Sequence, residues 1–271
     1  LLDGAPDGQP LRAMAATKVG KVIEEVKVKP PVRARPSGKL AGWGVLFEVC
    51  TEEASTLGQA AVEYDGIDVR RITKARDWSN PTTVEELIAE ARKLPGASAH
   101  ASLPCTSWST WQAMSEHKFG QEYTDKLTVR REESRQMLAS FIRFAETILA
   151  GGGEVSFEWP KTCLGWHLPE LLDMITRFDM HSVIVHGCPL RMTNTEGEPV
   201  LKQWRFVTTS ARMAAALEPL KCSHDAGFRH GEIAGATTAR TAAYPMQLCH
   251  TILSSLFGFM ERTPAMACAL L

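Results

Sequence analysis

The sequence predicts an α/β fold in which helices cover both faces of a mainly parallel sheet. Strand-like apolar runs alternate with helix-like periodicity between residues 43 and 185, and no internal repeat interrupts this order. A hairpin-like stretch at residues 191–210, with its turn at Thr195-Glu196-Gly197, adds antiparallel strands near the C-terminus. The 271 residues are enough for one large domain, and the 44% hydrophobic and 23% charged residues are typical of a globular protein.

Each element is predicted from its own pattern of apolar residues. Strands are expected at residues 45–50, 66–72, 97–103, 155–158 and 182–185. Helices are expected at residues 54–62, 82–91, 127–149, 169–178 and 245–260. Thr82-Thr83 is a start signal for the second helix, and Gly151-Gly152-Gly153 is a stop signal for the third.

The same patterns divide the chain into a linker, one domain and a tail. Residues 1–40 are rich in Pro and Lys/Arg and predict an extended linker, the alternative being a nuclear address or a nucleic-acid arm. The domain is expected at residues 41–260 and the tail at residues 261–271. A start at Leu1 rather than Met would fit a segment cut from a longer polypeptide.

Composition limits the classes of function. A net charge of −1 does not by itself indicate a nucleic-acid binder, and no apolar run approaches the roughly 20 residues that span a bilayer. The seven scattered cysteines are odd in number and favour a reduced intracellular compartment over a disulfide framework.

Two loops that follow predicted buried strands carry reactive side chains. Pro104-Cys105 follows the strand at 97–103, and Glu158 ends the apolar stretch that begins at Val155. Parallel sheets place chemistry at the carboxyl ends of their strands, so we expect the thiol and the carboxylate in one crevice. There a thiol can form a covalent adduct, and a partly buried carboxyl can donate a proton near neutrality. The alternatives are a small buried hydrophobe for Cys105 and a salt bridge to Arg205 for Glu158.

The loops after the first two strands predict a site for a small ligand. Of a glycine-rich diphosphate loop only Gly58 is present, and the acids around Glu48 suit a cationic or hydroxyl-bearing ligand. Asp68, taken as the end of the second strand, would accept hydrogen bonds from ribose hydroxyls, or else act as a simple cap or loop acid. Asp77-Trp78 would hold an adenine by its amine and its face, unless Trp78 belongs to the core.

A group of cysteines and histidines lies in the C-terminal half. Cys222, His224 and His230 are close in sequence, with Cys188 upstream and Cys249-His250 downstream. Zinc needs about four convergent ligands, and this spacing matches no common zinc pattern. We therefore predict no metal site.

Taken in order, these motifs resemble the cytosine-C5 methyltransferase family, whose members depend on S-adenosylmethionine. Pro104-Cys105 matches the family's Pro-Cys loop, and Glu158-Trp159-Pro160 matches its Glu-Asn-Val in part. Gln203-Trp204-Arg205 looks like its Gln-x-Arg strand, and Thr241 to Leu253, around Tyr244-Pro245, looks like its closing segment. Residues 211–240 stand where the family has a larger target-recognition region. The set is also similar to methyltransferase-like segments of retroelement polyproteins.

The resemblance implies a Rossmann-like sheet of the class I methyltransferase type and a role for each matched residue. Cys105 would attack carbon 6 of a cytosine, Glu158 would hydrogen-bond or protonate ring nitrogen 3, and Arg205 would orient the carboxylate or the base. Residues of the cofactor site would be Phe47, Glu48, Asp68, Asp77, Trp78 and Pro104.

The resemblance also implies partners. We expect S-adenosylmethionine as cofactor, nucleic acid as substrate (DNA rather than RNA), other segments of a longer polyprotein as neighbours, and no membrane. The expected location is intracellular, nuclear rather than cytoplasmic. One alternative is a catalytically inactive module that binds nucleic acid or cofactor for a polyprotein. Another is a different methyltransferase chemistry on the same sheet, acting on RNA or a small molecule.

Overall fold

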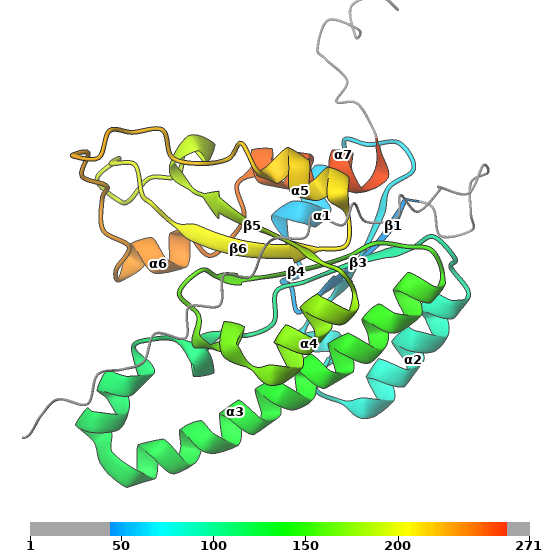
Figure 1. The fold of residues 1–271 in the computed structure, drawn as a ribbon, viewed down its shortest axis with the longest axis horizontal. Coiled ribbons are helices and arrows are strands. Elements are labelled where there is room, and N and C mark those ends of the chain that lie inside the picture. Colours follow the sequence, from blue (N-terminus) through cyan, green and yellow to red (C-terminus); the bar gives the residue numbers. More distant parts are fainter. Residues whose placement is uncertain (1–43, 259–271) are drawn as a thin grey trace, which may run out of the picture. The chain divides into compact units, whose positions relative to one another are not determined.

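A computed structural model gives the fold and describes residues 44–258 (Figure 1). The linker expected at residues 1–40 and the tail expected at residues 261–271 lie outside the described residues. Within residues 44–258, no helix is both long enough and apolar enough to cross a membrane.

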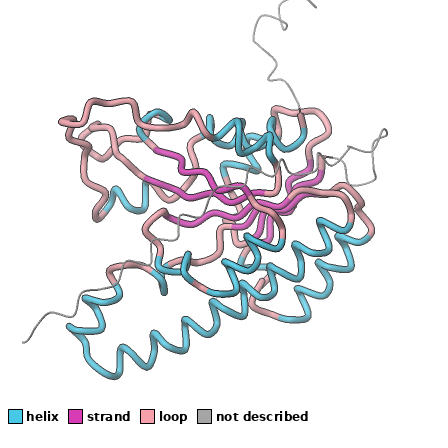
Figure 2. The backbone as a smooth tube through the Cα atoms, in the orientation of Figure 1, coloured by secondary structure: helices cyan, strands magenta, loops and turns pink. Residues whose placement is uncertain are grey.

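One mixed sheet of six strands forms the centre of the described fold, in the order β2-β1-β3-β4-β6-β5 (Figures 1 and 2). The strands are β1 (Val45–Val49), β2 (Asp68–Ile72), β3 (Ser98–Ala101), β4 (Val155–Pro160), β5 (His181–His186) and β6 (Gln203–Thr208). The first four are parallel, whereas β6 runs antiparallel between β4 and β5. The predicted α/β fold with a mainly parallel Rossmann-like sheet is confirmed.

The antiparallel C-terminal hairpin is present with wider bounds than the sequence indicated. Its arms are β5 and β6, and the predicted turn lies in the connection between them, where Asn194 N–H donates to the Glu198 carbonyl at 2.9 Å. The arms of that turn form only one bridge, Thr193 to Pro199. Strand β6 pairs instead with β4 on one side and with β5 on the other. Its apolar side chains Trp204 and Phe206 are buried, as expected for a strand inside the sheet.

Helices cover both faces of the sheet, as predicted (Figure 1). One face carries α1 (Thr56–Ala61), α5 (Ala211–Leu217) and α7 (Met246–Phe257), and the other carries α2 (Pro81–Arg92), α3 (Gln112–Ala150) and α4 (Pro169–Arg177). A short helix, α6 (Ala236–Arg240), precedes α7. Short 3-10 turns lie at Lys74–Arg76, Thr106–Trp108, Leu164–His167 and Cys188–Leu190.

The helix ends follow the local sequence. Asn80 caps α2 by accepting from the Thr82 N–H at 2.9 Å, and Pro81 occupies the first helical turn, so the helix begins slightly earlier than predicted. Gly151 ends α3 as predicted. The helix extends further toward the N-terminus than predicted, across a kink at Gly120, whose φ of 69° is in the left-handed region.

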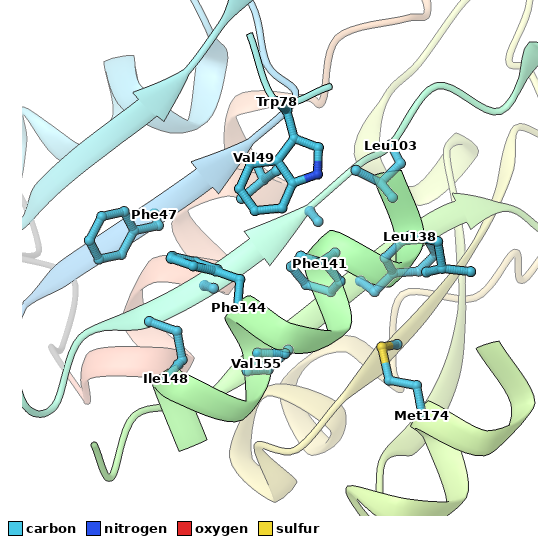
Figure 3. Close-up of a cluster of buried hydrophobic side chains, with 14 of the residues drawn as sticks. Phe47, Val49, Trp78, Leu103, Leu138, Phe141, Phe144, Ile148, Val155 and Met174 are labelled. Atoms are coloured by element: carbon cyan, nitrogen blue, oxygen red, sulfur yellow. The ribbon is translucent and has the colours of Figure 1, made fainter. Parts of the chain in front are cut away.

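The alternation of side chains along the strands decides which residues reach which face. Phe47 and Phe157 point toward α3 and belong to the core cluster shown in part in Figure 3. Leu46 and Phe206 point the other way, into the cluster under α1, α5 and α7. Polar residues of the central strands follow the same rule, since successive side chains point to opposite faces.

Phe144 of α3 should be a main determinant of stability. It is fully buried, and its ring centroid lies 5.3 Å from that of Phe47 and 5.6 Å from that of Trp78 (Figure 3). Phe144→Ala should lower the free energy of unfolding by about 3–5 kcal/mol in urea titrations, because it leaves a cavity in the core. The matched control is Phe119→Ala in the same helix, where the side chain is 57% exposed. Equal losses for the two variants would contradict this placement of α3.

Candidate active site

A cavity of about 430 Å³ opens at the carboxyl ends of β1, β3 and β4. Its walls come from the loop after β1, from the ends of β3 and β4, and from the segment before α7; the lining residues are Glu48–Thr51, Glu52, Ala54–Leu57, His100, Ser102, Glu158 and Ala242–Tyr244. Three of these are glutamates, and none of the described lining residues is Lys or Arg. This is the edge where parallel sheets hold ligands, and its charge suits a cation or a hydroxyl-bearing molecule.

Glu48 fixes the first wall of the cavity. Its carboxylate is buried and accepts hydrogen bonds from the Thr51 hydroxyl at 2.9 Å and the Ser55 hydroxyl at 2.6 Å. Burial raises the pKa of Glu48, and the two hydroxyls and the charge of Arg71 oppose this effect. Because Ser55 also caps α1 by accepting from the Gly58 N–H, the carboxylate is tied to the start of that helix.

The loop after β1 turns without glycine. Cys50 takes the left-handed conformation there, with φ of 60°, and lines the cavity. Burial, and then the charge of Asp77, raise the pKa of the Cys50 thiol to about 12. Asp77 is exposed, and two hydrogen bonds from Ser79 lower its pKa. Asp77 therefore lies near the carboxyl ends of the strands, as predicted, but does not line the cavity.

Glu158 is the second buried acid of the cavity. Its Oε2 accepts a hydrogen bond from the Tyr244 hydroxyl at 2.7 Å and one from the Ser102 hydroxyl at 3.2 Å. Its Oε1 is equally buried, yet no group among the described residues hydrogen-bonds to it. Burial raises the pKa of Glu158 from 4.5 to about 7, against the lowering effects of Tyr244, Ser102 and the charge of Lys202.

A chain of buried polar groups on the same face of the sheet leads to this acid. His100 Nδ1 lies 2.8 Å from the Ser156 hydroxyl, and Nε2 lies 3.1 Å from the Tyr244 hydroxyl. Complete burial lowers the pKa of His100 to about 4, so the ring is neutral at physiological pH. When Glu158 is ionised, the chain can run in one direction: Ser156 donates to His100, His100 to Tyr244, and Tyr244 to Glu158.

Cys105 lies beside Glu158. It is half-buried at the start of the 3-10 turn Thr106–Trp108, directly after β3. Burial raises the pKa of its thiol, the negative charge of Glu158 raises it further, and the positive charge of Lys202 lowers it. The structure thus brings the two predicted residues within electrostatic reach of each other, although Cys105 itself does not line the cavity.

Two residues that sequence reasoning did not assign complete the group. Lys202 precedes β6, is partly buried, and donates from Nζ to the Thr241 carbonyl. Tyr244 holds Glu158 from the segment that resembles a closing segment, and burial raises its pKa well above the usual value. The signals in the sequence were a lysine next to the motif Gln203-Trp204-Arg205 and a tyrosine inside the other matched segment.

Arg205 does not reach the cavity. It stands opposite Trp159 in the register of β4 and β6, whereas Glu158 stands opposite Phe206, so Arg205 and Glu158 point to opposite faces of the sheet. Arg205 Nε donates to the Ser182 hydroxyl at 2.9 Å, and its guanidinium lies 4.5 Å from the centroid of the Trp166 ring. Neither the predicted catalytic role nor the alternative salt bridge to Glu158 fits this position.

Besides Asp77, four more of the predicted cofactor residues lie outside the lining of the cavity, which leaves Glu48 as the one that lines it. Phe47 is core, and so is Trp78, whose Nε1 donates to the Met137 carbonyl at 3.1 Å. Asp68 begins β2 rather than ending it, because the strand continues to Ile72. This exposed acid therefore lies at the amino ends of the parallel strands, whereas the cavity lies at their carboxyl ends. Pro104 is exposed and borders Cys105 without lining the cavity.

The cysteines and histidines of the C-terminal half do converge. The ligand atoms of Cys188, Cys222, His224 and His230 all lie within 4.8 Å of one another. Local spacing could not indicate this, because Cys188 comes from a different segment, after β5.

Comparisons of the chain with protein-family models, with curated proteins and with solved structures found no match. A function for this protein therefore has to be inferred from its sequence motifs, its fold and the geometry of the site.

The raised pKa of Glu158 predicts a pH-dependent stability. The folded state binds a proton at Glu158 between pH 4.5 and about 7 that the unfolded state has released, so this carboxyl destabilises the fold increasingly as pH rises through that window. Glu158→Gln carries no such charge. In urea titrations, its free energy of unfolding relative to wild type should rise by about 2.5 kcal/mol between pH 5 and pH 8. The control is the same substitution at the exposed Glu86. A difference between Glu158→Gln and wild type that stays constant with pH would contradict the assignment.

Removing the charge of Glu158 and removing the charge of Lys202 should change the reactivity of the Cys105 thiol in opposite directions. Glu158→Gln removes the negative charge that raises the thiol pKa, so alkylation of Cys105 by iodoacetamide at pH 8 should be several-fold faster. Lys202→Gln removes the positive charge that lowers the pKa, so alkylation should be several-fold slower. Mass spectrometry of the Cys105 peptide measures both rates. Shifts in the same direction would disprove the arrangement.

Proposed function

We propose that this protein transfers a methyl group from S-adenosylmethionine to carbon 5 of a cytosine in nucleic acid, through a covalent adduct with Cys105. The observation that carries the proposal is the state of Glu158. Its carboxyl has a pKa of about 7 and a buried Oε1 without a partner among the described residues, and it lies beside Cys105 at the end of the adjacent parallel strand. The resemblance of the sequence motifs supplies the reaction.

Glu158 has the properties of an acid that protonates a ring nitrogen. At pH 7 about half of it carries a proton, which is the condition under which a general acid works best. Tyr244 and Ser102 hold Oε2, so the carboxyl cannot rotate freely, and Oε1 has no hydrogen-bond partner among the described residues. In the proposed reaction Oε1 would be the oxygen that faces the base. A cytosine offers ring nitrogen 3 as the acceptor of that proton.

Burial raises the pKa of the Cys105 thiol most, and protonation of Glu158 makes the thiolate easier to form than when Glu158 is ionised. Protonation removes the negative charge that raises the thiol pKa, while the positive charge of Lys202 remains. In the reaction the sulfur forms a bond to carbon 6 as the Glu158 proton moves to nitrogen 3, which makes carbon 5 nucleophilic. As carbon 5 takes the methyl group, the bond between that methyl and the sulfonium sulfur would break, and S-adenosylhomocysteine would leave as a neutral thioether. Carbon 5 then loses its proton to solvent, the bond between carbon 6 and the Cys105 sulfur breaks to return the thiolate, and nitrogen 3 returns its proton to Glu158.

The cavity fits a cationic cofactor of moderate size. Its volume of about 430 Å³ lies within the range of small-molecule sites, about 300–1,000 Å³. S-adenosylmethionine supplies an electrophilic methyl group on a sulfonium cation. Glu48, Glu52 and Thr51 would face its charged and hydroxyl groups, and no described lysine or arginine in the lining opposes its positive charge. The end of β2 offers Thr73 instead of an acid, so ribose binding would depend on other residues.

The acceptor base has to leave its helix or come from a single strand, because carbon 6 of a paired cytosine cannot reach Cys105. On the resemblance alone we propose DNA rather than RNA, a nuclear rather than a cytoplasmic location, and other parts of a longer polyprotein as partners.

A binding module without catalysis is the second candidate. It is favoured by the position of Cys105, which does not line the cavity, and by its raised thiol pKa. In that case the protein would bind S-adenosylmethionine or nucleic acid and transfer nothing.

Calorimetry with S-adenosylmethionine, together with transfer of a radiolabelled methyl group to cytosine-containing DNA and RNA, tests the proposal. Wild type should bind and transfer. Cys105→Ser should lose transfer but bind the cofactor within about threefold of wild type, and Glu158→Gln should lose about 10²–10⁴-fold in rate, the usual effect of removing a general acid. Cys268→Ser, outside the described residues, and exposed Glu86→Gln are the controls.

Two results would decide against the proposed chemistry. Normal transfer by Cys105→Ser would exclude this nucleophile. Binding by wild type with no transfer to either nucleic acid would select the binding module.

A further inference from the structure

Four metal-binding side chains meet at one point near the end of β5. Cys188 begins the 3-10 turn that follows this strand, and Cys222, His224 and His230 belong to the loop between α5 and α6. Their two sulfurs and two imidazole nitrogens all lie within 4.8 Å of one another. We call these four residues the Cys/His cluster.

The distances within the Cys/His cluster suit a tetrahedral metal ion. Cys222 Sγ lies 3.2 Å from His224 Nδ1 and 3.4 Å from His230 Nε2. Zinc holds sulfur at about 2.3 Å and nitrogen at about 2.0–2.1 Å, and tetrahedral angles then separate neighbouring ligands by about 3.3–3.8 Å. Only a small adjustment of the side chains is therefore needed to bind the ion.

The loop that carries three of these ligands has little else to hold it. Residues 221–230 contain no helix or strand, and most of them are exposed. Phe228, the one large apolar residue among them, is 40% exposed and packs on the ligands themselves, with its ring centroid 3.9 Å from that of His224. Cys222 and His230, by contrast, turn inward toward buried Cys188. Bonds to a metal would supply the stability that a hydrophobic core does not.

We propose that Cys188, Cys222, His224 and His230 bind one zinc ion in a closed, structural site. Two thiolates and two neutral imidazoles are a soft, four-ligand set that balances the charge of a divalent ion. Since the protein fills all four positions, no place is left for a catalytic water. The site requires none of the chemistry proposed for Cys105 and Glu158.

The surroundings of the cluster connect it to the sheet. The Cys222 N–H donates to His186 Nδ1 at 2.8 Å, and His186 Nε2 lies 3.0 Å from Gln203 Nε2, which joins the loop to the ends of β5 and β6. From the loop the chain continues through α6 to Ala242–Tyr244, which line the cavity. Zinc would thus anchor the segment that forms one wall of the candidate active site.

Metal analysis of the purified full chain tests the proposal directly. Protein from zinc-supplemented cells, purified without chelators, should contain about one zinc per chain by mass spectrometry. Cys222→Ser and His224→Ala should each retain less than about a fifth of that amount. Cys105→Ser and His117→Ala, matched changes outside the cluster, should retain it in full.

Cobalt substitution keeps the test valid where the variants fail to fold. Wild type in which Co²⁺ replaces the bound ion should show the sulfur-to-cobalt charge-transfer band and the intense visible bands of a tetrahedral site with thiolate ligands. Wild type with less than about a tenth of an equivalent of zinc would overturn the proposal. So would a cobalt spectrum without the charge-transfer band, or a Cys188–Cys222 disulfide detected by thiol titration.

Discussion

The burial of the Glu158 carboxyl at the end of β4 is the constraint on which the candidate site depends. A buried carboxylate is costly unless hydrogen bonds and a counter-charge compensate it. Here Tyr244 and Ser102 hydrogen-bond to one oxygen only, and within residues 44–258 no cation forms a salt bridge with the group. The carboxyl is therefore desolvated with only part of its hydrogen-bonding capacity used, and this accounts for its pKa of about 7.

Because successive side chains of a strand point to opposite faces, the register of the strands decides which polar residues lie on the same face as Glu158. Glu48 and His100 lie opposite each other on β1 and β3, and His100 lies opposite Ser156 on β4. Glu158 follows two positions further along β4 and therefore shares their face. Arg205 is displaced by one position from Phe206, the partner of Glu158, and so points to the other face. A shift of one position along the strand is therefore enough to place Arg205 against Trp166 on one face, while Glu158 lines the cavity on the other face.

The sequence was sufficient for the fold and for placing Cys105 and Glu158 near the carboxyl ends of neighbouring strands, because both follow from periodicity and from the rule that parallel strands end at one edge. It did not show that Cys105 lies outside the lining of the cavity. It was insufficient where an assignment depended on the exact end of a strand, as for Asp68. It was also insufficient where residues distant in sequence meet. Tyr244 lies 86 positions from Glu158, and no local pattern specifies their hydrogen bond.

The segment after α5 is the part of the structure where these distant contacts accumulate. Its loop places three side chains against Cys188, Thr241 accepts a hydrogen bond from Lys202, and Tyr244 then bonds to Glu158. Cys188 follows β5, Lys202 precedes β6, and the Tyr244 ring packs against Trp204 and Phe206 of β6. This wall of the cavity therefore depends on the antiparallel strands as well as on the parallel ones. The pKa of Glu158 depends on the same contacts, because Tyr244 and Lys202 both act on it. An anchor at the Cys/His cluster would therefore affect the acid without touching it, by fixing the wall that holds its hydrogen-bond donor.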